Sequence, residues 1–125
     1  MQGGRKIMLV SVRDETIARA ICKCWSTVYS DESIGIDWAG KGQGFSIYDL
    51  IDDEFEINFH DRKEWWIPGE RVADVKNIVK QKLMDAGINP TKLKVYGKTH
   101  TISWMNNRKY IAIHRIKFVE NIKKY

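Results

Sequence analysis

Residues 92–114 carry apolar and polar side chains in alternation around two turn-forming dipeptides, a pattern typical of antiparallel strands joined by tight turns. Asn106-Asn107 suits the centre of a two-residue hairpin turn, because asparagine tolerates positive φ. Gly97-Lys98 suits a second turn of this kind. Both turns assign the same side chains to the same face, and a slip of one residue in either would destroy that agreement. The region therefore predicts two C-terminal hairpins over residues 92–116.

These registers divide the region into a core face and an open face. The turn at Asn106-Asn107 pairs Ile102 with Ile111. The core face then holds Leu93, Val95, Ile102, Trp104, Ile111 and Ile113. The open face holds Lys92, Lys94, Tyr96, Thr99, Thr101, Ser103, Arg108, Tyr110 and His114.

Beyond His114 the alternation breaks, since Ile116 and Phe118 would continue onto the polar face. Two structures would bury these side chains. Either a bulge re-aims them, or a short terminal helix begins near Lys117. The run Phe118-Val119-Glu120-Asn121-Ile122 favours the helix, which is the structure we expect.

Two amphipathic helices are predicted upstream of the hairpins. Asp14 opens the first, which should end near Ser30, and its apolar stripe comprises Ile17, Ile21, Cys24, Trp25 and Val28. The second spans about residues 69–86, and its stripe comprises Val72, Val75, Val79, Leu83 and Ala86. Gly87 and Pro90 should end it, because glycine adopts the left-handed conformation and proline cannot continue a helix.

The remaining apolar segments predict strands. Residues 33–60 alternate over three segments around Gly-rich and Asp-rich connections, which predicts a three-stranded antiparallel meander, and Ile7–Val12 predicts one more strand. No linker rich in Pro, Ser or Gly divides the chain, and 125 residues can bury a core without disulfides. We therefore expect one α+β domain over residues 1–125, with two helices packed on antiparallel sheet and a short C-terminal helix.

Charge is strongly segregated along the chain, whose net charge is +5. Residues 92–125 hold nine basic side chains against Glu120 alone, and residues 31–56 hold eight acids against Lys41 alone. A merely solvated face usually mixes the two signs, so the basic segment indicates a polyanionic partner. We expect a small non-enzymatic module that binds nucleic acid, RNA or DNA, or a nucleoprotein through its C-terminal sheet face. The predicted binding residues are Lys92, Lys94, Tyr96, Lys98, Arg108, Tyr110, His114 and Arg115.

The sequence offers little for catalysis or for a cofactor. Cys22 and Cys24 would point about 200° apart on a helix, and the three histidines lack the spacing of a zinc site. We therefore expect no metal and no cofactor. No apolar run approaches the ~18 residues that a membrane span needs, and no secretory signal opens the sequence. The expected location is cytoplasmic, without membrane contact.

Three alternatives stay open. The acidic and basic segments could dock onto a host nucleic-acid-processing enzyme, as in small phage-type inhibitors of the anti-CRISPR kind, or onto each other in a homodimer. Ser33–Gly40 followed by Gly44–Ile47 also resembles the first hairpin of ribonuclease-H-like nucleases, which implies that Asp37 would help to hold divalent metals. The rest of the chain departs from that family, because no acid lies between Lys92 and Lys117. A metal-dependent nuclease is therefore the weaker alternative.

Overall fold

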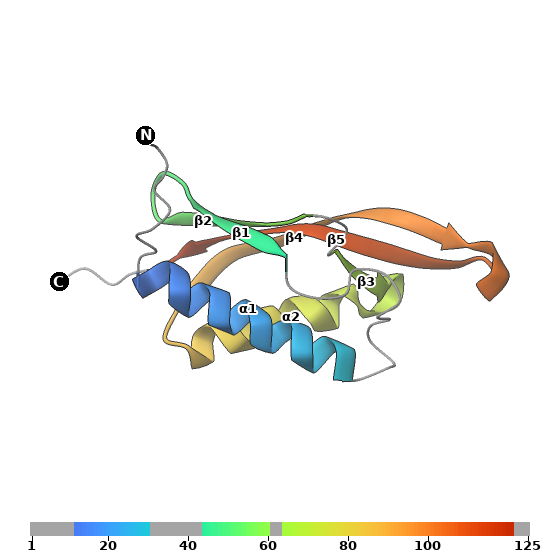
Figure 1. Cartoon of the computed structure of the whole chain (residues 1–125), viewed down its shortest axis with the longest axis horizontal. Helices are drawn as coiled ribbons and strands as arrows, with labels where there is room; N and C mark the ends of the chain where they lie inside the picture. Colours follow the sequence, from blue (N-terminus) through green and yellow to red (C-terminus); the bar gives the residue numbers. More distant parts are fainter. Residues whose placement is uncertain (1–11, 31–43, 61–63, 122–125) are drawn as a thin grey trace.

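Two helices lie against one face of a curled antiparallel sheet in the computed structural model, which describes residues 12–30, 44–60 and 64–121 (Figure 1). The predicted α+β class is confirmed in this broad form. The elements are α1 (Val12–Ser30), β1 (Phe45–Asp49), β2 (Glu54–Phe59), β3 (Trp65–Pro68), the 3-10 turn η2 (Gly69–Arg71), α2 (Val72–Asp85), β4 (Pro90–Ile102), the 3-10 turn η3 (Ser103–Met105) and β5 (Arg108–Glu120).

The two helices follow from their apolar stripes and their end signals. α1 begins two residues before the predicted Asp14, so Val12 belongs to this helix and not to a strand. α2 ends as predicted, because Gly87 adopts a φ of 87° and its N–H donates to the Met84 carbonyl over 3.0 Å. The Ile88 N–H donates to the Leu83 carbonyl over 2.9 Å, and the Ile88 side chain is buried. These two hydrogen bonds satisfy carbonyls that the helix end would otherwise leave unpaired.

β5 is the strand to which most of the sheet is paired. β4 runs antiparallel along one edge of β5. On the other edge β3 pairs with residues 110–113 and β2 with residues 115–119, so these two strands lie end to end. β1 then pairs with the outer side of β2. Within the described residues this gives a five-stranded sheet in which the last strand in sequence lies between all the others.

A bulge in β5 decides which side chains enter the core. Gly97 of β4 pairs with Ile113 and the preceding Tyr96 pairs with Arg115, so His114 is an extra residue in β5. The extra residue shifts the alternation, and Ile113 and Ile116 are therefore both fully buried. The C-terminal helix predicted from Lys117 is wrong, because β5 continues to Glu120 and the bulge re-aims the apolar side chains instead.

The two predicted hairpins are one long hairpin formed by β4 and β5 (Figure 1). The chain reverses at Asn106-Asn107 with the expected positive φ values of 59° and 57°, but residues 103–107 form the connection in place of the predicted two-residue turn. The turn at Gly97-Lys98 is wrong, since both residues lie inside β4. A Cβ atom on Gly97 would lie 2.6 Å from Cγ2 of Ile111 and 2.7 Å from the Ala112 carbonyl oxygen. Glycine is needed here for the close approach of β5 and not for a turn.

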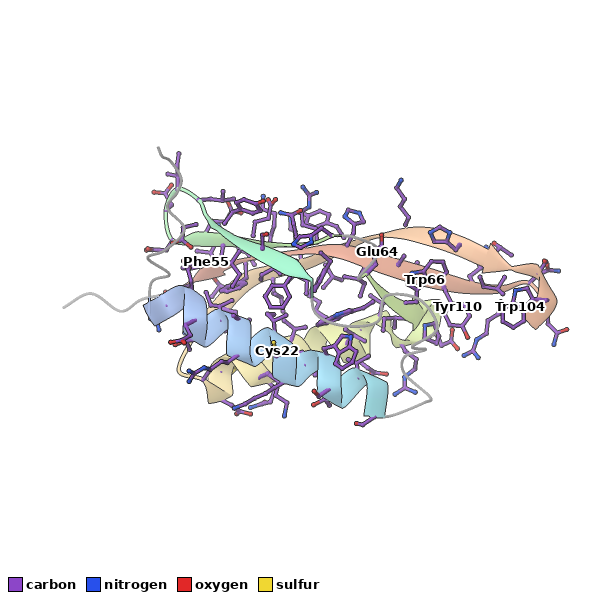
Figure 2. All side chains as sticks on the ribbon, viewed as in Figure 1. Cys22, Phe55, Glu64, Trp66, Trp104 and Tyr110 are labelled. Carbon is purple, nitrogen blue, oxygen red and sulfur yellow. The ribbon has the colours of Figure 1, made fainter. Side chains whose placement is uncertain are left out.

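The hairpin register also differs from the prediction. Ile102 pairs with Arg108 rather than with Ile111, because η3 takes up Ser103–Met105 before the turn. Trp104 is consequently 73% exposed at the far end of the hairpin and does not reach the core (Figure 2).

Two of the three strands predicted over residues 33–60 are present as β1 and β2. Their turn holds Asp52 and Asp53 at φ values of 61° and 58°. The first of the three predicted strands, over residues 33–38, and the predicted strand residues 7–11 lie outside the described residues. The sequence predicts no strand over residues 65–68, but in β3 Trp65 and Ile67 pair with Ile113 and Ile111 and are buried.

The core lies between the helices and the inner face of the sheet. Phe55 stacks on Phe118 at a centroid distance of 5.4 Å, and Phe59 contacts Trp65 at 5.0 Å. At the end of β5 the side chain of Glu120 is only 4% exposed and forms an ion pair with Arg13 of α1. This pair ties the first turn of α1 to the central strand.

We predict that Gly97→Ala destabilises the protein by roughly 1–3 kcal/mol, because the new Cβ would overlap backbone atoms that cannot move without breaking the β4–β5 pairing. Chemical denaturation monitored by circular dichroism measures this loss. Gly69→Ala is the matched control, since its Cβ would lie 3.7 Å from the Lys109 carbonyl oxygen, and its effect should stay within about 0.5 kcal/mol. Equal stability of the two variants would contradict the role assigned to Gly97.

Candidate functional site

The sheet face opposite the helices, here called the open face, collects side chains from five strands. Paired residues of antiparallel strands point to the same face, so the registers define rows across it. Four successive rows run from β2 or β3 through β5 to β4. They are Glu56–Lys117–Lys94, Asn58–Arg115–Tyr96, Trp66–Ala112–Lys98 and Pro68–Tyr110–His100.

Two contacts between flat groups lie on this face. The Arg115 guanidinium carbon lies 4.2 Å from the centroid of the Tyr96 ring. The Trp66 ring stacks on His100 with a centroid distance of 4.6 Å and an interplanar angle of 27°. The small side chain of Ala112 lies between Trp66 and β4 in the same row, which leaves room for the indole to reach across β5. The face thus combines flat rings with cations.

The structure places four of the predicted binding residues on the open face near one another. Lys94 and Lys98 are exposed, and Tyr96 and Arg115 are half-buried in contact with each other. Because β4 continues through Gly97 without a turn, Lys98 and His100 take the positions that were predicted for Thr99 and Thr101.

The other four predicted residues differ in their surroundings. Lys92 is exposed at a bulge of β4, and His114 is half-buried at the bulge of β5. Arg108 donates to Glu70 over 2.6 Å. Tyr110 was predicted to stack on a base, but it is only 1% exposed, between Pro68 and His100 in its row and with the Arg108 guanidinium 5.6 Å from its centroid. Its predicted stacking role is therefore wrong.

Three residues of the open face were not among the predicted binding residues: Trp66, His100 and Lys117. Lys117 was assigned to the C-terminal helix, although the alternative of a bulge would have placed it correctly. Trp66 and His100 come together because β3 and β4 flank β5, and no local pattern shows that long-range pairing.

Acidic side chains border the basic rows. Glu54 of β2 forms an ion pair with Lys117 at 3.3 Å. Glu56 accepts a hydrogen bond from Nδ2 of Asn58 at 2.6 Å. Two acids of the segment 31–56, Glu54 and Glu56, thus lie beside the basic rows on the same sheet, while Asp31, Glu32 and Asp37 lie outside the described residues.

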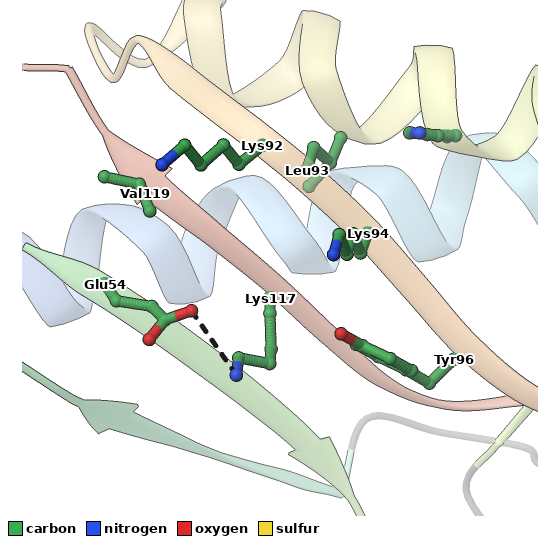
Figure 3. Close-up of a pocket in the computed structure, with 8 residues that line it drawn as sticks. Glu54, Lys92, Leu93, Lys94, Tyr96, Lys117 and Val119 are labelled. Carbon is green, nitrogen blue, oxygen red and sulfur yellow. Dashed lines mark ion pairs between the residues drawn. The ribbon is translucent and has the colours of Figure 1, made fainter.

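A pocket of about 440 Å³, here called the lysine pocket, lies where the open face meets the outer edge of β4 (Figure 3). Four of its lining residues are lysines, and they come from α2, β4 and β5. The full lining comprises Glu54, Lys76, Lys92, Leu93, Lys94, Tyr96, Lys117 and Val119. Lys92 has a φ of 52°, which is rare for a residue with a side chain.

Two carboxyl groups, Asp14 of α1 and Asp49 of β1, form a pair on the helix side of the sheet. Burial raises the pKa of Asp49 to about 6, and the hydrogen bond and negative charge of Asp14 add to that rise.

Burial also raises the pKa of the Cys24 thiol to about 12, which disfavours the reactive thiolate. Among the described residues no three His, Cys, Asp or Glu side chains are placed to hold a metal ion. Neither described helix is long and apolar enough to cross a membrane.

Comparison with known proteins gives no functional lead. No family model matches the chain, and neither a curated protein nor a solved structure is significantly similar to it. What the open face can bind must therefore be inferred from its own side chains and their contacts.

We predict that Asp49→Asn raises the melting temperature at pH 7.5 but not at pH 4. The folded state raises the pKa of Asp49 above its ordinary value of 3.8, so its contribution to stability is full below about pH 4 and is lost as the pH rises through about 6. Asparagine resembles the protonated acid at every pH. Because Asp49 is only partly removed from solvent, which screens its interactions, the gain should stay below about 1 kcal/mol.

Thermal melts of both proteins at the two pH values measure this effect. Asp52→Asn is the control, since it removes the same charge from the neighbouring turn. A difference between Asp49→Asn and the wild type that is the same at both pH values would contradict the carboxyl pair.

Proposed function

We propose that this protein is a non-enzymatic module that binds single-stranded nucleic acid on its open face. The observation that carries the proposal is the order of side chains along β4, where Lys94, Tyr96, Lys98 and His100 occupy successive open-face positions. Same-face residues of a strand are about 7 Å apart. A cation and a ring therefore alternate along β4 at a spacing that suits the phosphates and bases of an extended strand.

The neighbouring strands reinforce this order. β5 adds Arg115 beside Tyr96 and Lys117 beside Lys94, and β3 adds Trp66 against His100. Arg115 also holds the Tyr96 ring in place, so less freedom is lost when a base stacks on it. Stacking on such rings contributes about 1–3 kcal/mol per base and tolerates any sequence.

The basic residues supply the rest of the affinity. Lys94 and Lys98 are exposed, and neither forms an ion pair within the described residues. Each phosphate that they neutralise releases counterions, so binding should weaken steeply as salt rises. The adjoining carboxylates of Glu54 and Glu56 would repel phosphates and confine the strand to the β4–β5 side of the face.

A second candidate is a protein-docking adaptor or inhibitor. Exposed apolar side chains gather around the β1–β2 turn, where Ile51 is 82% exposed and Tyr48 and Leu50 are 50% and 40% exposed. Asp52 and Asp53 lie in the same turn. An apolar patch rimmed by acids is typical of a surface that meets a basic protein partner.

We predict that the double variant Lys94→Glu with Lys98→Glu weakens binding of single-stranded RNA or DNA about 100-fold at low salt, because attraction to phosphates becomes repulsion. Fluorescence anisotropy with labelled single-stranded RNA, single-stranded DNA and duplex DNA at two salt concentrations measures this. The control is Lys23→Glu with Lys80→Glu, which makes the same charge change on the helices and should retain most of the affinity.

Equal affinities of the two double variants would contradict the open-face assignment. Absence of binding to all three nucleic acids would favour the docking candidate, and Ile51→Lys should then abolish capture of the protein partner.

A further inference from the structure

The lysine pocket concentrates positive charge at one end of the open face (Figure 3). Four lysines against one glutamate give its lining a formal net charge of +3. The glutamate is already engaged, since Glu54 pairs with Lys117. In the part of the chain that the structure describes, Lys76, Lys92 and Lys94 form no ion pair. Like charges that share a pocket repel one another, and a bound anion would relieve that repulsion.

The backbone of β4 builds this pocket at a fixed place. Thr91 pairs with Val119 and Lys94 pairs with Lys117, so three steps along β4 match two along β5 and one residue is extra. Lys92 lies in this bulge with its backbone in the left-handed region. The Thr91 hydroxyl donates to the Val119 carbonyl at 3.1 Å and anchors the strand just before the bulge. An unfavourable backbone conformation held by its surroundings is typical of binding sites.

The other walls give the pocket a shape that suits a nucleotide. Leu93 and Val119 provide apolar surface, and the Tyr96 ring lies beside the lysines. A volume of about 440 Å³ falls in the range of small-ligand sites. Phosphate against the lysines and a flat base against Tyr96 would use each of these surfaces.

We propose that the lysine pocket binds the terminal phosphate of a nucleotide, either a free nucleotide or the last nucleotide of a bound strand. The second case rests on the proposed function. A terminal phosphate carries about −1.5 to −2 at neutral pH, whereas a phosphodiester carries a single charge, so a pocket of this charge favours the terminal group. Its position supports the same choice. Lys76 reaches the pocket from α2, on the side of the sheet opposite the open face, so the pocket lies at the border of that face, where the end of a strand bound along β4 can be held.

The test compares labelled single-stranded oligonucleotides of one sequence that end in a 5′-phosphate, a 3′-phosphate or hydroxyl groups alone. At least one phosphorylated form should bind about tenfold tighter than the hydroxyl form. Lys92→Asn should remove that preference, and asparagine keeps the left-handed backbone acceptable. Lys76→Gln should weaken it, while Lys80→Gln, one turn further along α2, should not.

Direct titration with AMP and ADP distinguishes the source of the phosphate. Lys92-dependent binding of AMP or ADP without any strand-end preference would assign the pocket to free nucleotides and support the proposal. If these nucleotides bind and no oligonucleotide does, the result supports phosphate binding in the lysine pocket and contradicts nucleic-acid binding on the open face. If the hydroxyl oligonucleotide binds with the same affinity as the phosphorylated forms and neither nucleotide binds, the pocket proposal is overturned and the open-face function stands.

Discussion

The backbone hydrogen bonding of β5 is the constraint on which the sheet depends. Its N–H and C=O groups pair with β4 along one edge and with β2 and β3 along the other, so three strands are positioned by one. The backbone N–H and C=O groups of a central strand are buried, and leaving them without hydrogen-bond partners would cost a large amount of folding free energy. β5 therefore requires a paired strand on each of its edges. The helices then need only to cover the apolar side chains that β5 and its neighbours present on the inner face.

The same strand links the core to the open face through a single extra residue. The bulge at His114 turns Ile116 and Phe118 toward the helices, which leaves Arg115 and Lys117 beside Tyr96 and Lys94. A regular strand would exchange these two sets and bury two cations. Core packing and the arrangement of cations on the open face are therefore two results of one backbone irregularity.

Local chemistry in the sequence predicts part of this fold. Gly87 and Ile88 mark the end of α2, and Asn106-Asn107 marks the hairpin turn, because these signals act through nearby backbone atoms. At Gly97 the local sequence predicts a turn, but glycine is also needed where another backbone comes close, and the sequence alone does not distinguish the two uses. The partners of β3, the burial of Tyr110 and the stacking of Trp66 on His100 depend on long-range strand pairing, which no short window of sequence contains.

The position of β5 in the chain affects how the protein can be made. Every other described element precedes β5 in sequence, so during synthesis β2 and β3 emerge before the strand to which both pair. Until then their edges and apolar faces stay open to other chains, and many contacts must close over long sequence separations. The helices can form early, but the sheet must await its last strand. The sheet can therefore close only after residues 108–120 have been synthesised, whether or not the helices have formed by then.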